Sequence, residues 1–121
     1  MITIWHNPKC SKSREALKLL EEKELNVEIF NYIDTAPSRK EIVALLLQLG
    51  ISARELMRTK EDLYKELGLA NIEDENRLID ILVEHPNLIE RPILIHENKA
   101  IIGRPVEKVI DFLGVSHAVS G

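Results

Sequence analysis

The spacing of hydrophobic and polar residues predicts a strand, a helix and a second strand in the first third of the chain. Residues 2–5, Ile-Thr-Ile-Trp, alternate as a strand does, and so do residues 27–32. Between them, Ala16, Leu17 and Leu20 lie on one face of a helix expected over Ser11–Lys23, with Ser11 or Ser13 as its cap. A strand–helix–strand unit of this kind predicts two parallel strands joined by a right-handed crossover.

The middle of the chain, about residues 38–85, is expected to be a helical insert. Capping boxes at Ser38–Glu41 and Ser52–Glu55 begin two helices, and Gly50 ends the first. Thr59 is expected to cap a short helix that ends at Gly68, with Leu63 and Leu67 facing inward. A longer helix over about Glu73–Glu84 is expected to bury Leu78, Ile81 and Leu82 and to stop before Pro86.

The last third returns to strands. Pro92–Ile95 and Ala100–Ile102, with a turn at Glu97-Asn98, predict a hairpin. A final helix follows, with Pro105 in its first turn and Gly114 at its end; its apolar face comprises Val106, Val109, Ile110 and Leu113. The order β-α-β, insert, β-β-α predicts an α/β fold with a mixed four-stranded sheet. We expect one domain over residues 1–115 and a flexible tail over residues 116–121.

Composition narrows the class of protein. With a net charge of −4 and only five aromatic residues in 121, the chain is poorly suited to binding nucleic acid. No apolar run approaches the ~20 residues of a membrane span, and no signal peptide precedes the first strand. We expect a cytoplasmic monomer. The single cysteine excludes an internal disulfide, and no Cys/His spacing suggests a metal site.

That cysteine, Cys10, lies in the stretch His6-Asn7-Pro8-Lys9-Cys10-Ser11-Lys12-Ser13-Arg14, between the first strand and the first helix. Cations and free N–H groups at a helix start lower a thiol pKa and attract oxyanions. We therefore predict a nucleophilic thiolate beside an anion site. The alternative is a small buried apolar residue, which the polar surroundings disfavour. A phosphatase loop of the Cys-x5-Arg type is excluded, because the sixth residue after Cys10 is Ala16 and not an arginine.

Three arginines at element boundaries are candidate oxyanion ligands. Arg91 precedes the hairpin and Arg104 follows it, so their backbones are expected to meet. The third is Arg58. Guanidinium groups hold tetrahedral oxyanions in bidentate fashion. The alternative is salt bridges, with Glu90 or Glu107 for the hairpin pair and with Glu61 or Asp62 for Arg58.

Two further residues have open interpretations. His6, four residues before Cys10, would favour the thiolate, or it would be a strand-end histidine bonded to the backbone. The serines Ser11 and Ser13 would cap the helix or contact a ligand.

The stretch from His6 to Arg14 resembles the signature of the glutaredoxin-coupled arsenate reductases. Leu56-Met57-Arg58, Glu90-Arg91-Pro92-Ile93 and Gly103-Arg104-Pro105 are similar to the three arginine motifs of that family, with matching spacing to Leu113. The resemblance implies a thioredoxin-like fold with a helical insert and a cis peptide bond before Pro92.

The resemblance also implies a reaction. Cys10 would attack arsenate while Arg58, Arg91 and Arg104 hold the oxyanion, supported by His6, Ser13, Arg14 and Pro92. No tightly bound cofactor is implied; glutathione would be a co-substrate and glutaredoxin a partner.

Two alternatives remain open. A sister group with this fold regulates transcription by binding RNA polymerase, but it usually has Cys-x-x-Cys, where this chain has Ser13. A glutathione-dependent thiol transferase would need Cys10 but not all three arginines.

Overall fold

A computed structural model describes residues 2–104 and 106–113 of the chain. The fold has two compact units. The first combines both ends of the chain, up to Asn31 and from Arg91 onward, and the second comprises Tyr32–Glu90. The second unit contains the predicted helical insert. The expected Pro105 turn, the helix end at Gly114 and the tail over 116–121 lie outside the described residues.

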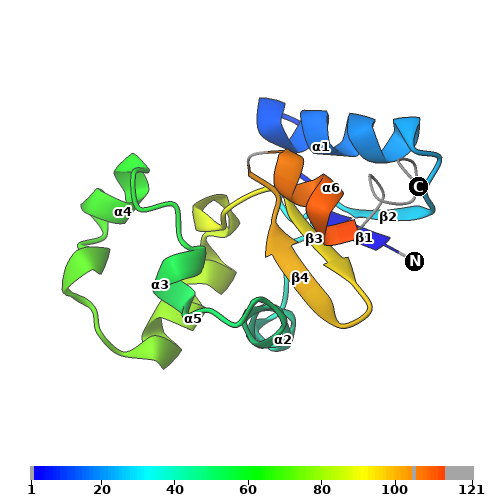
Figure 1. Cartoon of the computed structure of the whole chain (residues 1–121). Helices are drawn as coiled ribbons and strands as arrows, with labels where there is room; N and C mark the ends of the chain where they lie inside the picture. The colour runs from blue at the N-terminus through cyan, green and yellow to red at the C-terminus, as the bar shows by residue number, and fades with distance from the viewer. Residues whose placement is uncertain (1, 105, 114–121) are drawn as a thin grey trace. The chain divides into compact units, whose positions relative to one another are not determined.

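The first unit is built on a mixed four-stranded sheet, as predicted. Its strands are β1 (Ile2–Trp5), β2 (Val27–Phe30), β3 (Ile93–His96) and β4 (Lys99–Ile102), in the order β2-β1-β3-β4. β1 and β2 are parallel, whereas β1–β3 and β3–β4 are antiparallel. The predicted crossover and hairpin are therefore confirmed (Figure 1).

Two strand boundaries differ from the prediction. β2 ends at Phe30 and not at residue 32, because its partner β1 ends at Trp5, which pairs with Phe30. β3 begins at Ile93 and not at Pro92, because proline has no N–H to donate to the ladder. The peptide bond between Arg91 and Pro92 is cis, as the family resemblance implied.

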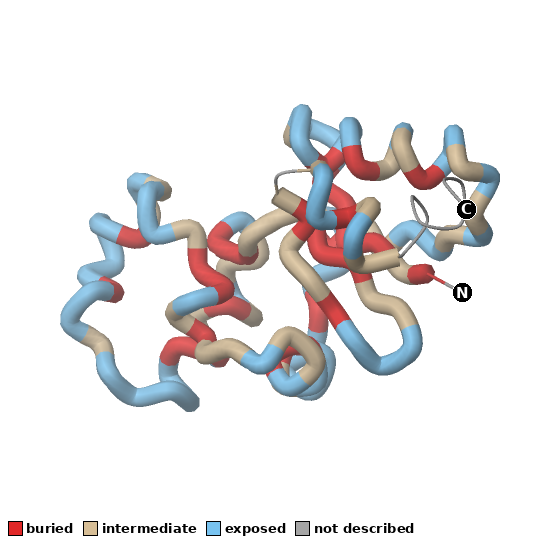
Figure 2. Tube along the Cα trace, viewed as in Figure 1, coloured by how far each residue is buried: buried red, intermediate tan, exposed pale blue. Residues whose placement is uncertain are grey.

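Helices α1 (Ser11–Glu22) and α6 (Glu107–Leu113) cover one face of this sheet (Figure 1). The core between them comprises Ile2, Ile4, Ala16, Leu20, Leu94 and Val109. Figure 2 shows the same division along the trace, with buried positions of α1 alternating with exposed ones. The apolar stripe of α1 therefore fixes which way its first turn faces.

The second unit is helical. It contains α2 (Arg39–Leu49), α3 (Ala53–Leu56), α4 (Asp62–Glu66), η1 (Leu69–Asn71), α5 (Glu75–Glu84) and η2 (Pro86–Leu88). Both capping boxes are present: at the first, the Ser38 N–H donates to Glu41 Oε1 (2.9 Å) and the Glu41 N–H to Ser38 Oγ (3.1 Å). Gly50 ends α2 in the left-handed conformation, at φ 69°.

The start and the inner face of α4 were predicted wrongly. The helix begins after Glu61 and not after Thr59. Its buried side chain is Tyr64, whereas Leu67 is 41% exposed. Arg54 explains the difference, because its guanidinium donates to the Tyr64 hydroxyl and, at 3.1 Å, to the Leu69 carbonyl. A polar anchor therefore determines which face of this short helix is buried.

Helix α5 begins at Glu75, two residues later than predicted, because the Asp74 side chain accepts from the Asn76 N–H (3.2 Å) and caps it. It buries Leu78, Ile79 and Leu82, so the inward position expected for Ile81 is wrong. Helix α5 contacts both α2 and α3, and the face that it presents to them includes Ile79, whereas Ile81 is half-buried. No described helix is long and apolar enough to cross a membrane.

Leu45 and Leu47, two positions apart on α2, provide a matched test of this packing. Leu45 is 1% exposed and Leu47 is 78% exposed. We expect Leu45→Ala to lower the free energy of unfolding by about 2–5 kcal/mol, because it empties a packed site. Leu47→Ala is expected to change it by about 0.5 kcal/mol or less. Urea unfolding of both variants measures the difference, and equal effects would contradict the buried face assigned to α2.

Candidate functional site

Three segments of the chain leave the sheet of the first unit at one end. Trp5, which ends β1, pairs with Ile93, which begins β3, and Ile93 pairs with Ile102, which ends β4. The loop after β1, the residue Arg91 before β3 and the residue Arg104 after β4 therefore emerge together. The predicted meeting of the two hairpin ends is confirmed.

Cys10 lies at this end of the sheet, at the N-cap position of α1, and its side chain is half-buried and free. The cap makes no side-chain hydrogen bond to the helix, so the expected capping by Ser11 or Ser13 is wrong. The Arg14 N–H does bond to the Cys10 carbonyl (3.0 Å), which places the thiol at the open N–H groups of the first turn.

The pKa of the Cys10 thiol lies below its ordinary value. Partial burial by itself raises it. Three groups lower it and together outweigh the effect of burial. They are the N–H of Ser13, the Arg91 guanidinium, which acts through a hydrogen bond and its charge, and the N–H of Lys12. The thiol is thus biased toward the thiolate, the form that acts as a nucleophile.

These donors differ from the cations that the sequence suggested. The Lys12 side chain lies 3.9 Å from the Glu15 carboxylate and is half-exposed. Arg14 turns back along the loop, where its Nη1 donates to the Pro8 carbonyl (2.9 Å). The charge that acts on Cys10 is that of Arg91, which is 81 positions away in the sequence.

Arg91 retains a donor beyond its bond to Cys10. Its Nε is buried and has no hydrogen-bond partner among residues 2–104 and 106–113. Arg104 is held by the hairpin, since the Gly103 N–H donates to the Pro92 carbonyl (2.8 Å). Gly103 is required there, because a Cβ would lie 2.9 Å from a methyl group of Val109. The convergence of both arginines on one anion stays a prediction.

Arg58 belongs to the helical unit, where it is half-buried. Its guanidinium pairs with Glu61, and its Nε lies 3.5 Å from Glu90 Oε1. Its N–H donates to the Leu88 carbonyl (2.7 Å), beside an antiparallel bridge between Met57 and Ile89. Of the salt bridges that the sequence offered, Glu61 is confirmed, and the second partner is Glu90 and not Asp62. Its role as an oxyanion ligand stays a prediction.

His6, Asn7 and Ser13 are the buried polar side chains among the described residues, and they form one cluster next to Cys10. His6 Nδ1 lies 2.7 Å from Ser13 Oγ, and the Asn7 N–H donates to Ser13 Oγ (3.0 Å). Burial lowers the pKa of His6 below its usual value, Arg14 adds to this effect and Glu21 opposes it, so the ring is neutral at neutral pH. The ring of His6 therefore bonds to a side chain, while its backbone N–H donates to the Phe30 carbonyl (2.9 Å).

Asn7 is a residue that sequence reasoning missed. Its carbonyl accepts from the Cys10 N–H (3.0 Å) and its Oδ1 from the Lys9 N–H (3.0 Å), so it folds the loop back to Cys10. The available signal was the Asn-Pro pair directly after a strand, which is typical of a turn.

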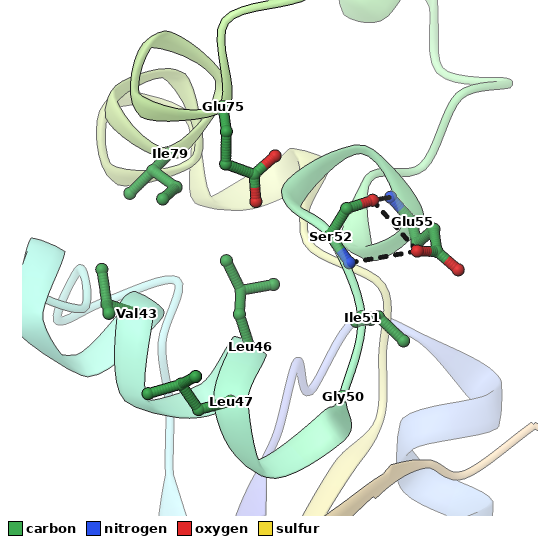
Figure 3. A pocket seen from close by; sticks show the side chains of 9 residues that line it. All are labelled: Val43, Leu46, Leu47, Gly50, Ile51, Ser52, Glu55, Glu75 and Ile79. Carbon is green, nitrogen blue, oxygen red and sulfur yellow. Dashed lines mark hydrogen bonds between the residues drawn. The ribbon is translucent and has the colours of Figure 1, made fainter.

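Other features of the described chain offer less chemistry. No group of three His, Cys, Asp or Glu side chains in residues 2–104 and 106–113 could hold a metal ion. A hollow of about 360 Å³ in the helical unit, between α2, α3 and α5, is lined mainly by aliphatic side chains (Figure 3). Its two carboxylates already act as caps: Glu55 closes a capping box, and Glu75 accepts from the Ala53 N–H (2.9 Å). Neither feature competes with Cys10, which stays the predicted reactive residue.

Comparison with known proteins identifies the family. The ArsC family model matches residues 5–112. The chain belongs to the ArsC family. Curated relatives named arsenate reductase include one from Neisseria meningitidis, 49% identical over 89% of this chain and 94% of its own length, and one from Escherichia coli, 41% identical over 93% and 80%. The solved structure of an arsenate reductase from Vibrio cholerae aligns with a TM-score of 0.87 and 46% identity over 91% of this chain and 95% of its own. These likenesses confirm the thioredoxin-like α/β fold of the family.

Arg91 and Lys9 test the origin of the reactive thiol. Alkylation of Cys10 should accelerate with rising pH through an apparent pKa below the value of about 8.5 for a free cysteine, and then level off. We expect Arg91→Ala to move this profile to higher pH, because it removes a hydrogen bond and a positive charge from the thiolate. Lys9→Ala, an exposed cation in the same loop, should move it much less. A larger shift in Lys9→Ala would contradict the assignment to Arg91.

Proposed function

We propose that this chain is an arsenate reductase in which Cys10 is the nucleophile and glutathione and glutaredoxin supply the electrons. The observation that carries the proposal is the pairing of Cys10 with Arg91. A thiol biased toward the thiolate lies at the open N–H groups of a helix and touches a guanidinium whose buried Nε has no partner among the described residues. A buried donor without a partner is unfavourable, and an oxyanion oxygen would satisfy it.

The family relationship supports arsenate as that oxyanion, because relatives at 41–49% identity over most of the chain are named arsenate reductase. In this proposal Arg91 and Arg104 bind arsenate from the two ends of the hairpin. Arg58 is proposed as a third ligand on the basis of its family motif alone. Arg14 and Pro92 support the loop and the hairpin on either side of the nucleophile.

The proposed chemistry begins with the Cys10 thiolate attacking arsenic. An arsenate oxygen leaves as water after protonation, and Cys10 carries an arsenic(V) thioester. The thiol of glutathione then replaces a second oxygen. Glutaredoxin attacks the glutathione sulfur, and the As–S bond to glutathione breaks with its electron pair passing to arsenic. Water releases arsenite from Cys10, and the oxidised product is a glutaredoxin–glutathione mixed disulfide.

The count of sulfurs supports an external reductant. Reduction of arsenate to arsenite takes two electrons, and forming one disulfide supplies two. The chain contains one cysteine, so both sulfurs of that disulfide must come from other molecules if Cys10 is to be regenerated. The half-exposed position of Cys10 is compatible with an approaching protein thiol.

Arsenate reduction should depend on Cys10 and on the hairpin arginines. In an assay with arsenate, glutathione, glutaredoxin and NADPH-dependent glutathione recycling, we expect Cys10→Ser to be inactive. Arg91→Ala and Arg104→Ala should each lower kcat/KM by a factor of roughly 10²–10³, the usual effect of losing one oxyanion donor. Arg39→Ala is the control, because Arg39 pairs with Asp80 in the helical unit. If both hairpin variants reduced arsenate at the wild-type rate, the oxyanion site would be wrong.

The same assay separates the alternatives. A glutathione-dependent thiol transferase would act on a glutathione mixed disulfide with Cys10 present and with either hairpin arginine removed. The transcriptional alternative predicts binding to RNA polymerase and no arsenate reduction.

The electron donors are tested by omission. We expect turnover to require both glutathione and glutaredoxin, because Cys10 has no second cysteine in the chain to resolve its adduct. Thioredoxin with its reductase, in place of both, should support little arsenite formation. Full activity with thioredoxin and no glutathione would refute the proposed donors while leaving the nucleophile in place.

A further inference from the structure

The buried cluster next to Cys10 has a feature that the proposed chemistry does not use. Ser13 lies in the first turn of α1 and is fully buried, yet its hydroxyl does not cap the helix. It bonds instead to His6 and to the Asn7 N–H, in the loop between β1 and α1 (Figure 1). Buried polar groups are expected to be fully bonded, so the direction of these bonds can be worked out.

A hydroxyl group has one proton and two lone pairs. The Asn7 N–H takes one lone pair of the Ser13 oxygen at 3.0 Å. If a neutral His6 donated from Nδ1, the buried hydroxyl proton would have no acceptor in the cluster. If Ser13 donates its proton to Nδ1 at 2.7 Å, both partners are satisfied. The ring proton of His6 then lies on Nε2.

The backbone N–H of Ser13 has a second role. This N–H, with that of Lys12, lowers the pKa of the Cys10 thiol. The same residue therefore acts on Cys10 through its backbone and contacts the preceding loop through its hydroxyl. Asn7 links the loop to Cys10 as well, because its carbonyl accepts from the Cys10 N–H (3.0 Å).

We propose that the Ser13 hydroxyl is a positioning group for Cys10, with a neutral His6 as its acceptor. The bond holds the loop against the start of α1, so that the sulfur stays within reach of the N–H groups of the first turn. In this arrangement His6 acts through a hydrogen bond and not through a positive charge. The effect of Ser13 on the reactivity of the Cys10 thiol does not depend on the proposed function. Only an effect of Ser13 on turnover rests on the proposed arsenate reduction.

The first test reads the wild-type protein directly. In ¹⁵N NMR of the imidazole ring at pH 7, we expect His6 to be neutral, with Nε2 protonated and Nδ1 bare. An Nδ1–H tautomer, or a charged ring, would overturn the proposal. This measurement needs no variant and no arsenate.

The second test compares pH profiles of Cys10 alkylation. Ser13→Ala removes the hydroxyl, so the profile should move to higher pH and the rate at pH 7 should fall roughly 2- to 12-fold, the effect typical of one hydrogen bond. Ser11→Ala, an exposed serine two residues earlier on the same helix, should leave the profile unchanged. An unchanged profile in Ser13→Ala would overturn the proposal.

His6 variants separate a hydrogen bond from a charge. The amide of His6→Asn can accept from Ser13 at about the position of Nδ1 but never carries a charge, so it should keep the wild-type profile. His6→Ala should shift it as Ser13→Ala does. Equal shifts in both His6 variants would refute the hydrogen-bond role. Thermal unfolding identifies any variant that has lost its fold. If the variants do not fold, the NMR measurement of the His6 tautomer in the wild-type protein decides whether the proposal holds. Because alkylation involves no arsenate, failure of the proposed function would leave these results unaffected.

Discussion

The reactivity of this protein depends on a competition at one sulfur atom. Withdrawing the Cys10 thiolate from water is unfavourable, and partial burial alone would keep the thiol protonated. Two N–H groups of α1 and the Arg91 guanidinium reverse that preference. Both groups reach the sulfur only in the folded chain. The N–H groups are available because a helix begins at Cys10, and the guanidinium is available because the hairpin brings Arg91 back to it.

The sheet meets both requirements with few residues. Pairing of β1 with β3 brings the loop that carries Cys10 to the residue before the hairpin, and the β3–β4 register brings Arg104 to the same end. The core below, in which Ile4 and Leu94 pack with Leu20 of α1, fixes the helix against this sheet. Substitutions in that core would therefore act on the site through the direction of the helix start.

Ser13 connects the fold to the chemistry. The sister group with this fold usually has a second cysteine three residues after the first, whereas this chain has Ser13 there. In this chain the position is fully buried and its side chain is bonded to the loop. A buried residue at this position is compatible with the proposed external thiol, because a resolving sulfur then does not have to come from the helix.

The sequence by itself determined the elements that local chemistry decides. Both capping boxes and the Gly50 end of α2 are confirmed, because side chains a few residues apart satisfy the open backbone groups. The alternation in residues 2–5 and 27–32, with the apolar runs and the turn of the hairpin, likewise predicted the mixed sheet. The family motifs around Cys10 and the three arginines were sufficient to identify the ArsC family and the cis bond at Pro92.

Tertiary structure decided what depends on partners far away in the chain. The inward face of α4 follows Arg54, and that of α5 follows two neighbouring helices, so one-stripe reasoning failed for both. The lowered pKa of Cys10 was expected from N–H groups at the helix start and from nearby cations. The N–H groups of Ser13 and Lys12 do contribute, but the charge comes from Arg91, because the side chains of Lys9 and Lys12 are exposed while the hairpin brings a guanidinium to the sulfur. Local pattern predicts Cys10 as the nucleophile, but only the paired strands decide which charge lies beside it.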